Sequence, residues 1–311
     1  MKLVLLGGDG QVGWELRRAL ALLGELWVLD RRGAGEACGD LEKPDSLMRA
    51  LRRLEPDVIV NAAAYTDVDR AESDPARAAD VNASAPALLA EEAKHLGALL
   101  VHYSTDYVFD GSGTRPWRED DPAAPINVYG RTKWEGEQRI RESGCRHLIL
   151  RTQWIFSVRR RNFLRTVLAA AAERDRLAVV DDQIGAPTGA ELVADVTAHA
   201  LRSLADRPES AGTYHVAARG ETSRCGYARF AVGHARRVGL PLRLREDAIV
   251  PIGSDALSAA ACRPLNGRLA TGRLELTFGL RMPDWRIGVV RAIAELGRMN
   301  RGELQREEPP T

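Results

Sequence analysis

The stretch Lys2-Leu3-Val4-Leu5-Leu6-Gly7-Gly8-Asp9-Gly10-Gln11-Val12-Gly13 opens the chain with an apolar run that ends in glycines. This order, continued by an amphipathic segment, predicts a strand, a tight turn and a helix. The spacing is G-x-x-G-x-x-G, whereas G-x-G-x-x-G is commoner. In either spacing, glycines turn sharply and let the backbone approach a pyrophosphate, which meets the positive end of the helix dipole. Gly7, Gly10 and Gly13 therefore predict a dinucleotide site. The alternative is a glycine-rich turn in a nucleotide-free α/β protein.

Charged residues follow the second predicted strand, 25–29. Asp30 comes about twenty residues after the glycines, where a carboxylate can accept hydrogen bonds from the adenosine ribose. Arg31 and Arg32 follow directly and could hold a 2′-phosphate. Asp30 therefore favours NAD, and the two arginines leave NADP open. The pair Asp40-Leu41 closes a further apolar turn and could flank the adenine.

Strand-like and helix-like segments alternate through the N-terminal half of the chain. Such alternation predicts an α/β fold with a doubly wound parallel sheet of the Rossmann type. In these sheets, ligands bind at the carboxyl ends of the strands. The strands are expected at 2–6, 25–29, 57–63, 98–103 and 147–151, and the helices at 12–23, 44–54, 75–96 and 129–141.

The pattern loosens beyond Phe156. We expect a dinucleotide-binding domain over 1–156, and over 157–311 a smaller α/β substrate-binding lobe with some segments returning to the first domain. The polar tail that ends Glu307-Glu308-Pro309-Pro310-Thr311 is expected to be disordered. The later helices are expected at 162–173, 191–204, 226–238 and 283–299, with a strand at 212–217 and irregular structure over 256–269.

The bulk composition narrows the class of protein. A net charge of +1 lacks the footprint of nucleic-acid or anionic-membrane binding. No apolar stretch approaches the ~18 residues that span a bilayer. The four scattered cysteines show no metal-ligand spacing and read as reduced thiols. We therefore expect a soluble cytoplasmic protein with no nucleic-acid or membrane partner. No sequence pattern indicates a metal site. A homodimer stays an open possibility.

Tyr129 and Lys133 are four residues apart in a chain with only four lysines among its 44 basic residues. Positions i and i+4 share a face of a helix, so the two side chains can act together. A compact ammonium beside a phenol lowers the pKa of the phenol. Such a phenol is a proton donor for carbonyl reduction when a hydride source lies nearby. Taken alone, the pair could also be an ordinary aromatic and a solvated base.

The string Tyr103-Ser104-Thr105-Asp106-Tyr107 follows the predicted strand 98–103, at the edge where catalytic groups collect. A hydroxyl at this edge can hydrogen-bond a substrate carbonyl oxygen as negative charge builds on it. We assign this role to Thr105, with Ser104 as the weaker choice. Taken alone, the hydroxyls could simply belong to a turn at the end of the strand.

Four motifs in this order resemble the extended short-chain dehydrogenase/reductases, and the match covers nearly the whole chain. They are the glycine turn, Asn61-Ala62-Ala63-Ala64, Ser104-Thr105-Asp106 and Tyr129-x-x-x-Lys133. Longer strings narrow the resemblance to the nucleotide-sugar ketone reductases of that family. These are Gly10-Gln11-Val12-Gly13-Trp14-Glu15-Leu16, Cys38-Gly39-Asp40, His102 to Phe109, Asn127-Val128-Tyr129-Gly130, Asp182 to Gly189 and Arg263-Pro264.

The resemblance implies a hydride transfer from NADPH or NADH to the C4 ketone of dTDP-4-dehydro-6-deoxy-L-mannose, which gives dTDP-L-rhamnose. Tyr129 would donate the proton, Lys133 would bind the nicotinamide ribose, and Thr105 would align the ketone. Asp106 and Trp154 would contact the sugar, although Trp154 could equally be a core residue. The cofactor would contact Gly10, Gln11, Val12, Asp30, Asp40, Leu41, Ala64, Tyr65, Thr66 and Tyr103.

Two features depart from the pattern or extend it. The basic run Val158 to Arg161 replaces a small, glycine-containing loop, and we interpret it as a solvated loop that could contact the nucleotide diphosphate. Some family members bind Mg²⁺ at a dimer interface through acidic side chains, and Glu15 and Glu191 are weak candidates here.

Three other functions share the fold. A dehydratase needs a second carboxylate after Asp106, where this chain has Tyr107, which weakens that reading. A 4-epimerase stays open. A non-catalytic regulatory relative would not need the intact Thr105, Tyr129 and Lys133.

Overall fold

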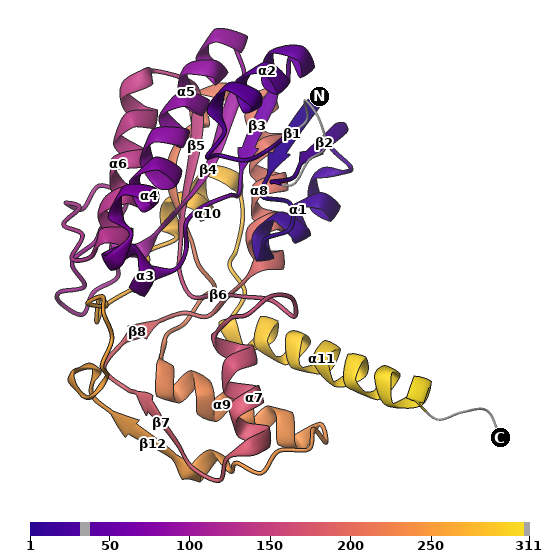
Figure 1. The fold of residues 1–311 in the computed structure, drawn as a ribbon, viewed down its shortest axis with the longest axis vertical. Helices are drawn as coiled ribbons and strands as arrows, with labels where there is room; N and C mark the ends of the chain where they lie inside the picture. Colours follow the sequence, from indigo (N-terminus) through magenta and orange to yellow (C-terminus); the bar gives the residue numbers. More distant parts are fainter. Residues whose placement is uncertain (32–37, 308–311) are drawn as a thin grey trace.

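The computed structural model describes the backbone of residues 1–31 and 38–307. Its centre is a six-stranded sheet with the strand order β10-β5-β4-β3-β1-β2, in which every neighbouring pair is parallel. The predicted doubly wound parallel sheet is therefore confirmed (Figure 1). Its strands are β1 (Lys2–Leu6), β2 (Glu25–Leu29), β3 (Val58–Asn61), β4 (Leu99–Thr105), β5 (His147–Thr152) and β10 (Gly212–Val216). Arg32 and residues 308–311 of the tail lie outside the described residues.

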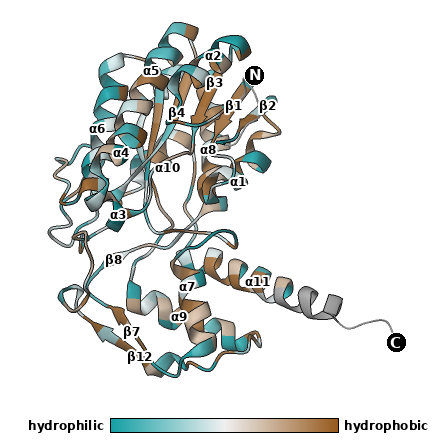
Figure 2. Cartoon of the chain, viewed as in Figure 1, coloured by the Kyte–Doolittle hydropathy of each residue, from teal (hydrophilic) through white to brown (hydrophobic). Residues whose placement is uncertain are grey.

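Helices cover both faces of this sheet because successive strand residues point to opposite sides. On β1, Leu3 and Leu5 join one buried cluster, whereas Val4 and Leu6 join another. The strands are accordingly apolar along their length, while the outer helix surfaces are polar (Figure 2). One face carries α1 (Gln11–Leu20), α8 (Ala190–Asp206) and α10 (Gly272–Phe278), and the other carries α2 (Pro44–Leu54), α5 (Ala85–Leu96) and α6 (Val128–Ser143).

The second half of the chain divides its segments between this sheet and a smaller lobe. Strand β10, α8 and α10 return to the sheet, and β10 lies at its edge beside β5. The smaller lobe packs its own apolar clusters next to the carboxyl edge of the sheet (Figure 1). Its elements are the parallel pair β7 (Leu177–Val180) and β12 (Ile249–Ile252), with α7 (Phe163–Glu173), α9 (Arg224–Arg237) and α11 (Trp285–Glu307).

The expected single helix over 75–96 is interrupted. It consists of α4 (Pro75–Ala79), a π-helical turn at Asp80–Ser84 and then α5. Such turns occur often at functional sites. Here the turn sets Asn82 against the sheet, where its side chain contacts both backbone groups of Tyr65.

Other boundaries also differ from the expectations. Strand β4 continues past Tyr103 to Thr105, and α11 continues past residue 299 to Glu307. Helices α3 (Val68–Ser73) and α10 and strand β12 were not predicted, because each is short and lacks a clear apolar period. Among the described residues, no helix combines the length and the apolar character needed to cross a bilayer.

Candidate active site

The glycine turn after β1 is packed too closely for side chains. Gly7 has a φ of 75°, and a Cβ there would fall 2.6 Å from the Ala63 nitrogen. A Cβ on Gly13 would fall 2.0 Å from the Gly7 oxygen, which instead accepts a hydrogen bond from Gly10 N at 2.9 Å. Only glycine fits these positions, so the backbone N–H groups at the start of α1 lie open to a ligand. This cradle fits a dinucleotide pyrophosphate.

A cavity of about 130 Å³ lies beside this turn, between the ends of β1, β2 and β3. Two arginines stand at it, and both bind the same carboxylate: Arg77 lies 2.8 Å from Glu42, and Arg31 forms a close ion pair with it. Asp30 is not among the lining residues; its carboxylate lies 3.2 Å from Arg17 Nη2. The lining includes Gly7, Asp40, Leu41, Ala63, Ala64 and Tyr65.

The π-helical turn fixes one wall of this cavity. Asn82 Oδ1 accepts from Tyr65 N at 2.9 Å, and its Nδ2 donates to Tyr65 O at 3.0 Å and to Thr132 Oγ1 at 3.2 Å. Asn82 thereby ties the segment after β3 to α6. Ala64 and Thr66 on either side of Tyr65 are exposed. Asn82 was missed in the sequence because the π-helical turn interrupts an otherwise regular helical pattern.

The hydroxyl pair forms where β4 ends and α6 begins. The hydroxyls of Thr105 and Tyr129 lie close together, so that Thr105 acts to lower the pKa of the phenol. Thr105 Oγ1 donates to Asp106 Oδ1 at 3.1 Å. The ring of Tyr107 packs edge-on against Tyr129, with centroids 5.7 Å apart. Asn127 caps the N-terminus of α6, because its Oδ1 accepts a hydrogen bond from Gly130 N at 2.8 Å. Tyr129 therefore lies in the first turn of the helix. The sequence motifs therefore meet at one point.

Ser104 occupies a different environment from Thr105. Its hydroxyl is buried and makes no hydrogen bond within the described part of the chain. It lies near Glu137 on α6, a buried carboxylate that Arg151 binds at 2.7 Å. Burial acts to raise the pKa of Glu137, but Arg151, Ser104 and Arg141 together bring it below its ordinary value. Ser104 thus lies beside the buried carboxylate of Glu137, which favours Thr105 as the residue that faces a ligand.

Lys133 lies one turn after Tyr129 on α6, and its amine points at β4. Its Nζ donates to Tyr103 O at 2.6 Å and lies 3.1 Å from His102 Nε2. Burial raises the pKa of Tyr129 above its ordinary value, against the effect of the Thr105 hydroxyl. The amine of Lys133 contacts β4 in this structure, and the expectation that it makes the phenol more acidic stays a prediction. Tyr103 Oη in turn contacts Thr197 Oγ1 at 2.9 Å.

An arginine from the smaller lobe completes the site. Arg224, the first residue of α9, lies with its Cζ 3.8 Å from the centre of the Trp154 ring. Trp154 follows β5 with a φ of 46°, a left-handed conformation that is uncommon outside glycine and is enriched at functional sites. Burial raises the pKa of Asp106 to about 7, against the Thr105 hydrogen bond and the charge of Arg224.

A second arginine, Arg263, lies on the same side of the site. It binds Asp69 with two hydrogen bonds, of 2.6 and 2.7 Å, and also hydrogen-bonds Tyr107. Neither Arg224 nor Arg263 was assigned a role from the sequence. Arg263 stood in a quoted string, whereas Arg224 carried no sequence signal, because the smaller lobe brings it to the site only through tertiary packing.

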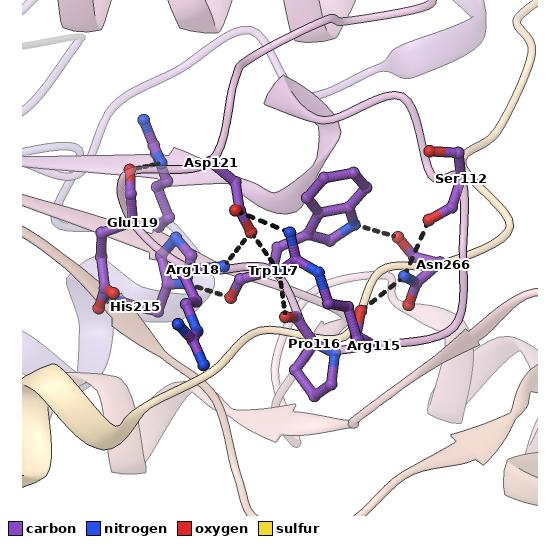
Figure 3. A network of polar contacts seen from close by, with 10 residues as sticks. Ser112, Arg115, Pro116, Trp117, Arg118, Glu119, Asp121, His215 and Asn266 are labelled. Atoms are coloured by element: carbon purple, nitrogen blue, oxygen red, sulfur yellow. Dashed lines mark hydrogen bonds and ion pairs between the residues drawn. The ribbon is translucent and has the colours of Figure 1, made fainter.

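A polar network holds the loop after β4 against the segment that follows β12 (Figure 3). Asn266 Nδ2 donates to Ser112 O at 3.1 Å and to Arg115 O at 2.9 Å, and Trp117 Nε1 donates to Asn266 O at 3.0 Å. The next residue, Gly267, lies against Asp106, because a Cβ there would fall 2.5 Å from Asp106 Oδ2. The network therefore fixes the backbone that borders the Asp106 carboxylate.

The basic run after β5 is attached to the glycine turn. Arg160 Nε donates to Asp9 O at 2.9 Å, and Gln11 Oε1 accepts from Ser157 Oγ at 3.0 Å. Arg159 stacks on Trp14, with its Cζ 3.9 Å from the ring centre. The arginine side chains are exposed, as expected of a solvated loop, but the backbone at Arg160 is held at a φ of 58°.

The two candidate Mg²⁺ ligands lie close to arginines. Glu191 is 3.2 Å from Arg291, and Glu15 is 3.7 Å from Arg18. Burial raises the pKa of Glu191, and the charge of Glu15 adds to this shift. Within residues 1–31 and 38–307, no group of three or more potential ligands gathers. A Mg²⁺ requirement stays a prediction from the resemblance alone.

Comparisons with known proteins agree on one family. The model of the RmlD substrate binding domain matches residues 1–298. The dTDP-4-dehydrorhamnose reductase of Escherichia coli K12 is 47% identical over 296 residues, covering 95% of this chain and 98% of that protein. The Burkholderia thailandensis enzyme of the same name is 45% identical over 300 residues, with 95% and 99% covered.

A solved structure resembles the whole chain. The dTDP-4-dehydrorhamnose reductase of Bacillus anthracis, crystallised in complex with NADP, superposes with a TM-score of 0.84 at 29% identity, covering 94% of this chain and 99% of that one. Sequence likeness over nearly the full length, the family model and this shared fold all lead to one assignment. The chain belongs to the dTDP-4-dehydrorhamnose reductase family.

Proposed function

We propose that this protein reduces the C4 ketone of dTDP-4-dehydro-6-deoxy-L-mannose to dTDP-L-rhamnose, with NADPH or NADH, in dTDP-rhamnose biosynthesis. One observation supports this most directly. The neighbouring hydroxyls of Thr105 and Tyr129 lie at the carboxyl edge of the sheet, beside a glycine turn that fits a dinucleotide pyrophosphate. The full-length likeness to the Escherichia coli reductase supplies the substrate.

The bound cofactor would supply a hydride to the ketone carbon. Tyr129 would donate the proton that the ketone oxygen then needs. Burial raises the pKa of this phenol, so the phenol keeps its proton at neutral pH and acts as an acid rather than a base. Thr105 would hydrogen-bond the same oxygen as charge develops on it. Lys133, held against β4, would bind the nicotinamide ribose and fix the end of the cofactor.

Arg224 and Arg263 suit the negatively charged part of the substrate. Both lie at Tyr107, and Arg224 covers the Trp154 ring. We infer that Trp154 and Asp106 contact the sugar, while the two guanidinium groups face the diphosphate. Residues 1–156 would then bind the cofactor and contribute Asp106 and Trp154 to the sugar site, and residues of 157–311 would mainly bind the substrate.

We propose that NADPH is accepted at least as well as NADH. Asp30, which would repel a 2′-phosphate, is engaged by Arg17, and Arg31 and Arg77 stand at the adenosine cavity. Arg160 would add a positive charge beside the glycine turn. We further propose a cytoplasmic protein, in keeping with four free thiols, and a homodimer.

The experiment is to supply dTDP-4-dehydro-6-deoxy-L-mannose with each reduced nicotinamide in turn and to follow cofactor absorbance and product. We expect loss of absorbance together with formation of dTDP-L-rhamnose. A 4-epimerase or a dehydratase would convert its sugar without net consumption of the cofactor. Conversion of the sugar at unchanged absorbance would therefore contradict our proposal and favour one of these two activities. A regulatory relative would give neither signal.

A further inference from the structure

A buried histidine lies beneath Lys133 and has no role in the reaction as described so far. His102 is in the middle of β4, is 1% exposed, and pairs in register with Asn61 at the end of β3. Its Nδ1 lies 3.2 Å from Asn61 Nδ2, and its Nε2 lies 3.1 Å from Lys133 Nζ. The imidazole therefore links two neighbouring strands to the lysine that would hold the cofactor.

A backbone N–H group decides the direction of the hydrogen bonds that link Asn61, His102 and Lys133. Ala63 N donates to Asn61 Oδ1 at 3.2 Å, which leaves Asn61 Nδ2 facing His102. An amide nitrogen can only donate, so His102 Nδ1 accepts. Burial is the main cause that holds the pKa of His102 well below its ordinary value, so the ring is neutral. A neutral ring that accepts at Nδ1 carries its hydrogen on Nε2 and directs it at Lys133 Nζ.

We propose that His102, oriented by Asn61, is a positioning residue that holds Lys133 and favours its free-amine form until the cofactor binds. An ammonium has no lone pair and cannot accept the Nε2 hydrogen, whereas a free amine can. The other contact of Lys133, donation to Tyr103 O at 2.6 Å, suits both forms. The inference deepens the function proposed above, because it concerns the lysine assigned to the cofactor.

The charges around Lys133 do not oppose this form strongly. Glu137, one turn further along α6, favours the ammonium, but Arg151 and Arg141 bind that carboxylate at 2.7 and 3.0 Å. The other titratable neighbours, Tyr129 on α6 and Tyr103 on β4, stay neutral because burial raises the pKa of each phenol. Burial lowers the pKa of Lys133 to about 8, against the charge of Glu137. An anionic dinucleotide would reverse this balance, and the lysine would take up a proton on binding.

The scarcity of lysine makes the test direct. With ¹⁵N or ¹³C at the end of the lysine side chain, the full-length protein gives only the signals of Lys2, Lys43, Lys94 and Lys133. Single Lys→Arg variants at the first three positions assign them. We expect Lys133 to titrate about two pH units below a solvated lysine, whose midpoint is about 10.4. In His102→Gln, the amide oxygen can accept from an ammonium, so the midpoint should rise by about one unit.

His215→Gln is the matched control. His215 is also fully buried, on β10, and its Nδ1 contacts Trp117 O at 3.1 Å rather than Lys133. It should leave the Lys133 midpoint in place. The proposal is overturned if Lys133 titrates with the other lysines in the wild-type protein, if His102→Gln leaves its midpoint unmoved, or if His215→Gln moves it equally. The wild-type titration alone can refute the proposal even if a variant does not fold, because an ordinary midpoint for Lys133 would overturn it. It needs no substrate, so it stands apart from the test of the reaction.

Discussion

The guanidinium of Arg224 covers the indole of Trp154 at 3.8 Å, which brings the first residue of α9 over the residue that follows β5. Trp154 keeps a left-handed backbone under this contact. The pair joins the smaller lobe to the sheet at the edge where Thr105 and Tyr129 meet. The substrate side of the site is therefore built from both halves of the chain, and the following expectations test its parts.

Arg224→Gln should weaken substrate binding more than turnover. The variant loses the charge that faces Asp106 and Tyr107, and a charge-assisted contact to a phosphate contributes roughly 1.5–3 kcal/mol. We expect KM for the nucleotide sugar to rise about tenfold or more, with KM for NADPH unchanged. Arg237→Gln, at the exposed end of the same helix, is the control. Equal effects of the two changes would remove Arg224 from the site.

Tyr129→Phe should abolish most of the turnover and leave cofactor affinity intact. The change removes only the hydroxyl that lies next to Thr105, and general acid catalysis typically contributes about 10²–10⁴-fold. Steady-state kinetics with a fluorescence titration of NADPH would separate the two effects. Tyr214→Phe, whose hydroxyl donates to Ser210 O at 2.7 Å, is the control. Turnover retained in Tyr129→Phe would mean that another group donates the proton.

Asp106→Asn should stabilise the protein at high pH only. The pKa of this carboxyl is raised from 3.8 to about 7 by burial, so the native state loses stability as pH rises from about 4 through 7. The variant escapes a cost of at most about 4 kcal/mol for such a shift. Urea unfolding at several pH values measures the difference.

Asp121→Asn is the matched change of opposite sign. Arg115 holds the pKa of Asp121 at about 2, so this carboxylate stabilises the native state above pH 4 and loses that effect as pH falls through 2. We expect Asp121→Asn to destabilise at neutral pH. If Asp106→Asn behaved in the same way, the raised pKa of Asp106 would be refuted.

Glu137→Gln should lower the free energy of unfolding by roughly 3 kcal/mol, because it leaves a buried guanidinium without its carboxylate. Glu137 is fully buried, and Arg151, itself 2% exposed, binds it and stacks between Phe109 and Trp134. Glu135→Gln, two residues earlier on the exposed side of α6, should change stability by less than about 0.5 kcal/mol. Denaturant titration of both variants measures the two free energies of unfolding. Similar values would mean that Glu137 contributes no more to stability than an exposed charge.

Arg160→Gly should raise the stability of the protein and weaken its binding of the cofactor. A left-handed backbone at a non-glycine residue costs about 1–2 kcal/mol, and glycine removes this strain. Glycine also makes the unfolded chain more flexible, which offsets part of the gain, so we expect the free energy of unfolding to rise by up to about 1 kcal/mol. Loss of the charge beside Asp9 should raise KM for NADPH. The neighbouring Arg161→Gly, where φ is ordinary, should be slightly destabilising. A loss of stability in Arg160→Gly would contradict the backbone argument.

Local motifs were enough to predict the parallel sheet and to place Thr105 and Tyr129 at one edge of it. The glycine turn, Ser104-Thr105-Asp106 and Tyr129-x-x-x-Lys133 each follow or begin an element with a clear apolar period, and parallel strands bring such ends together. What the spacing could not show was where an amine points. The i+4 relation places Lys133 on the face of Tyr129, but the free carbonyl of Tyr103 and the imidazole of His102 bind it instead.

The positions of residues from the second half of the chain at the site could not be predicted, for a different reason. Arg224 and Asn266 act through contacts with residues far away in sequence, and neither belongs to a periodic pattern. Asn82 required knowledge of a π-helical turn, which shifts the side chains of a helix by one position relative to the regular repeat.

The place of β10 bears on how this protein can be cut. A fragment that ends at Phe156 would keep the five strands with the cofactor motifs but lose β10, which pairs with β5, and α8, which covers Leu3 and Leu5. Its outermost strand would then offer unsatisfied backbone groups, and a broad apolar face would be bare to water. Such a fragment is a template for aggregation rather than a free-standing nucleotide-binding module.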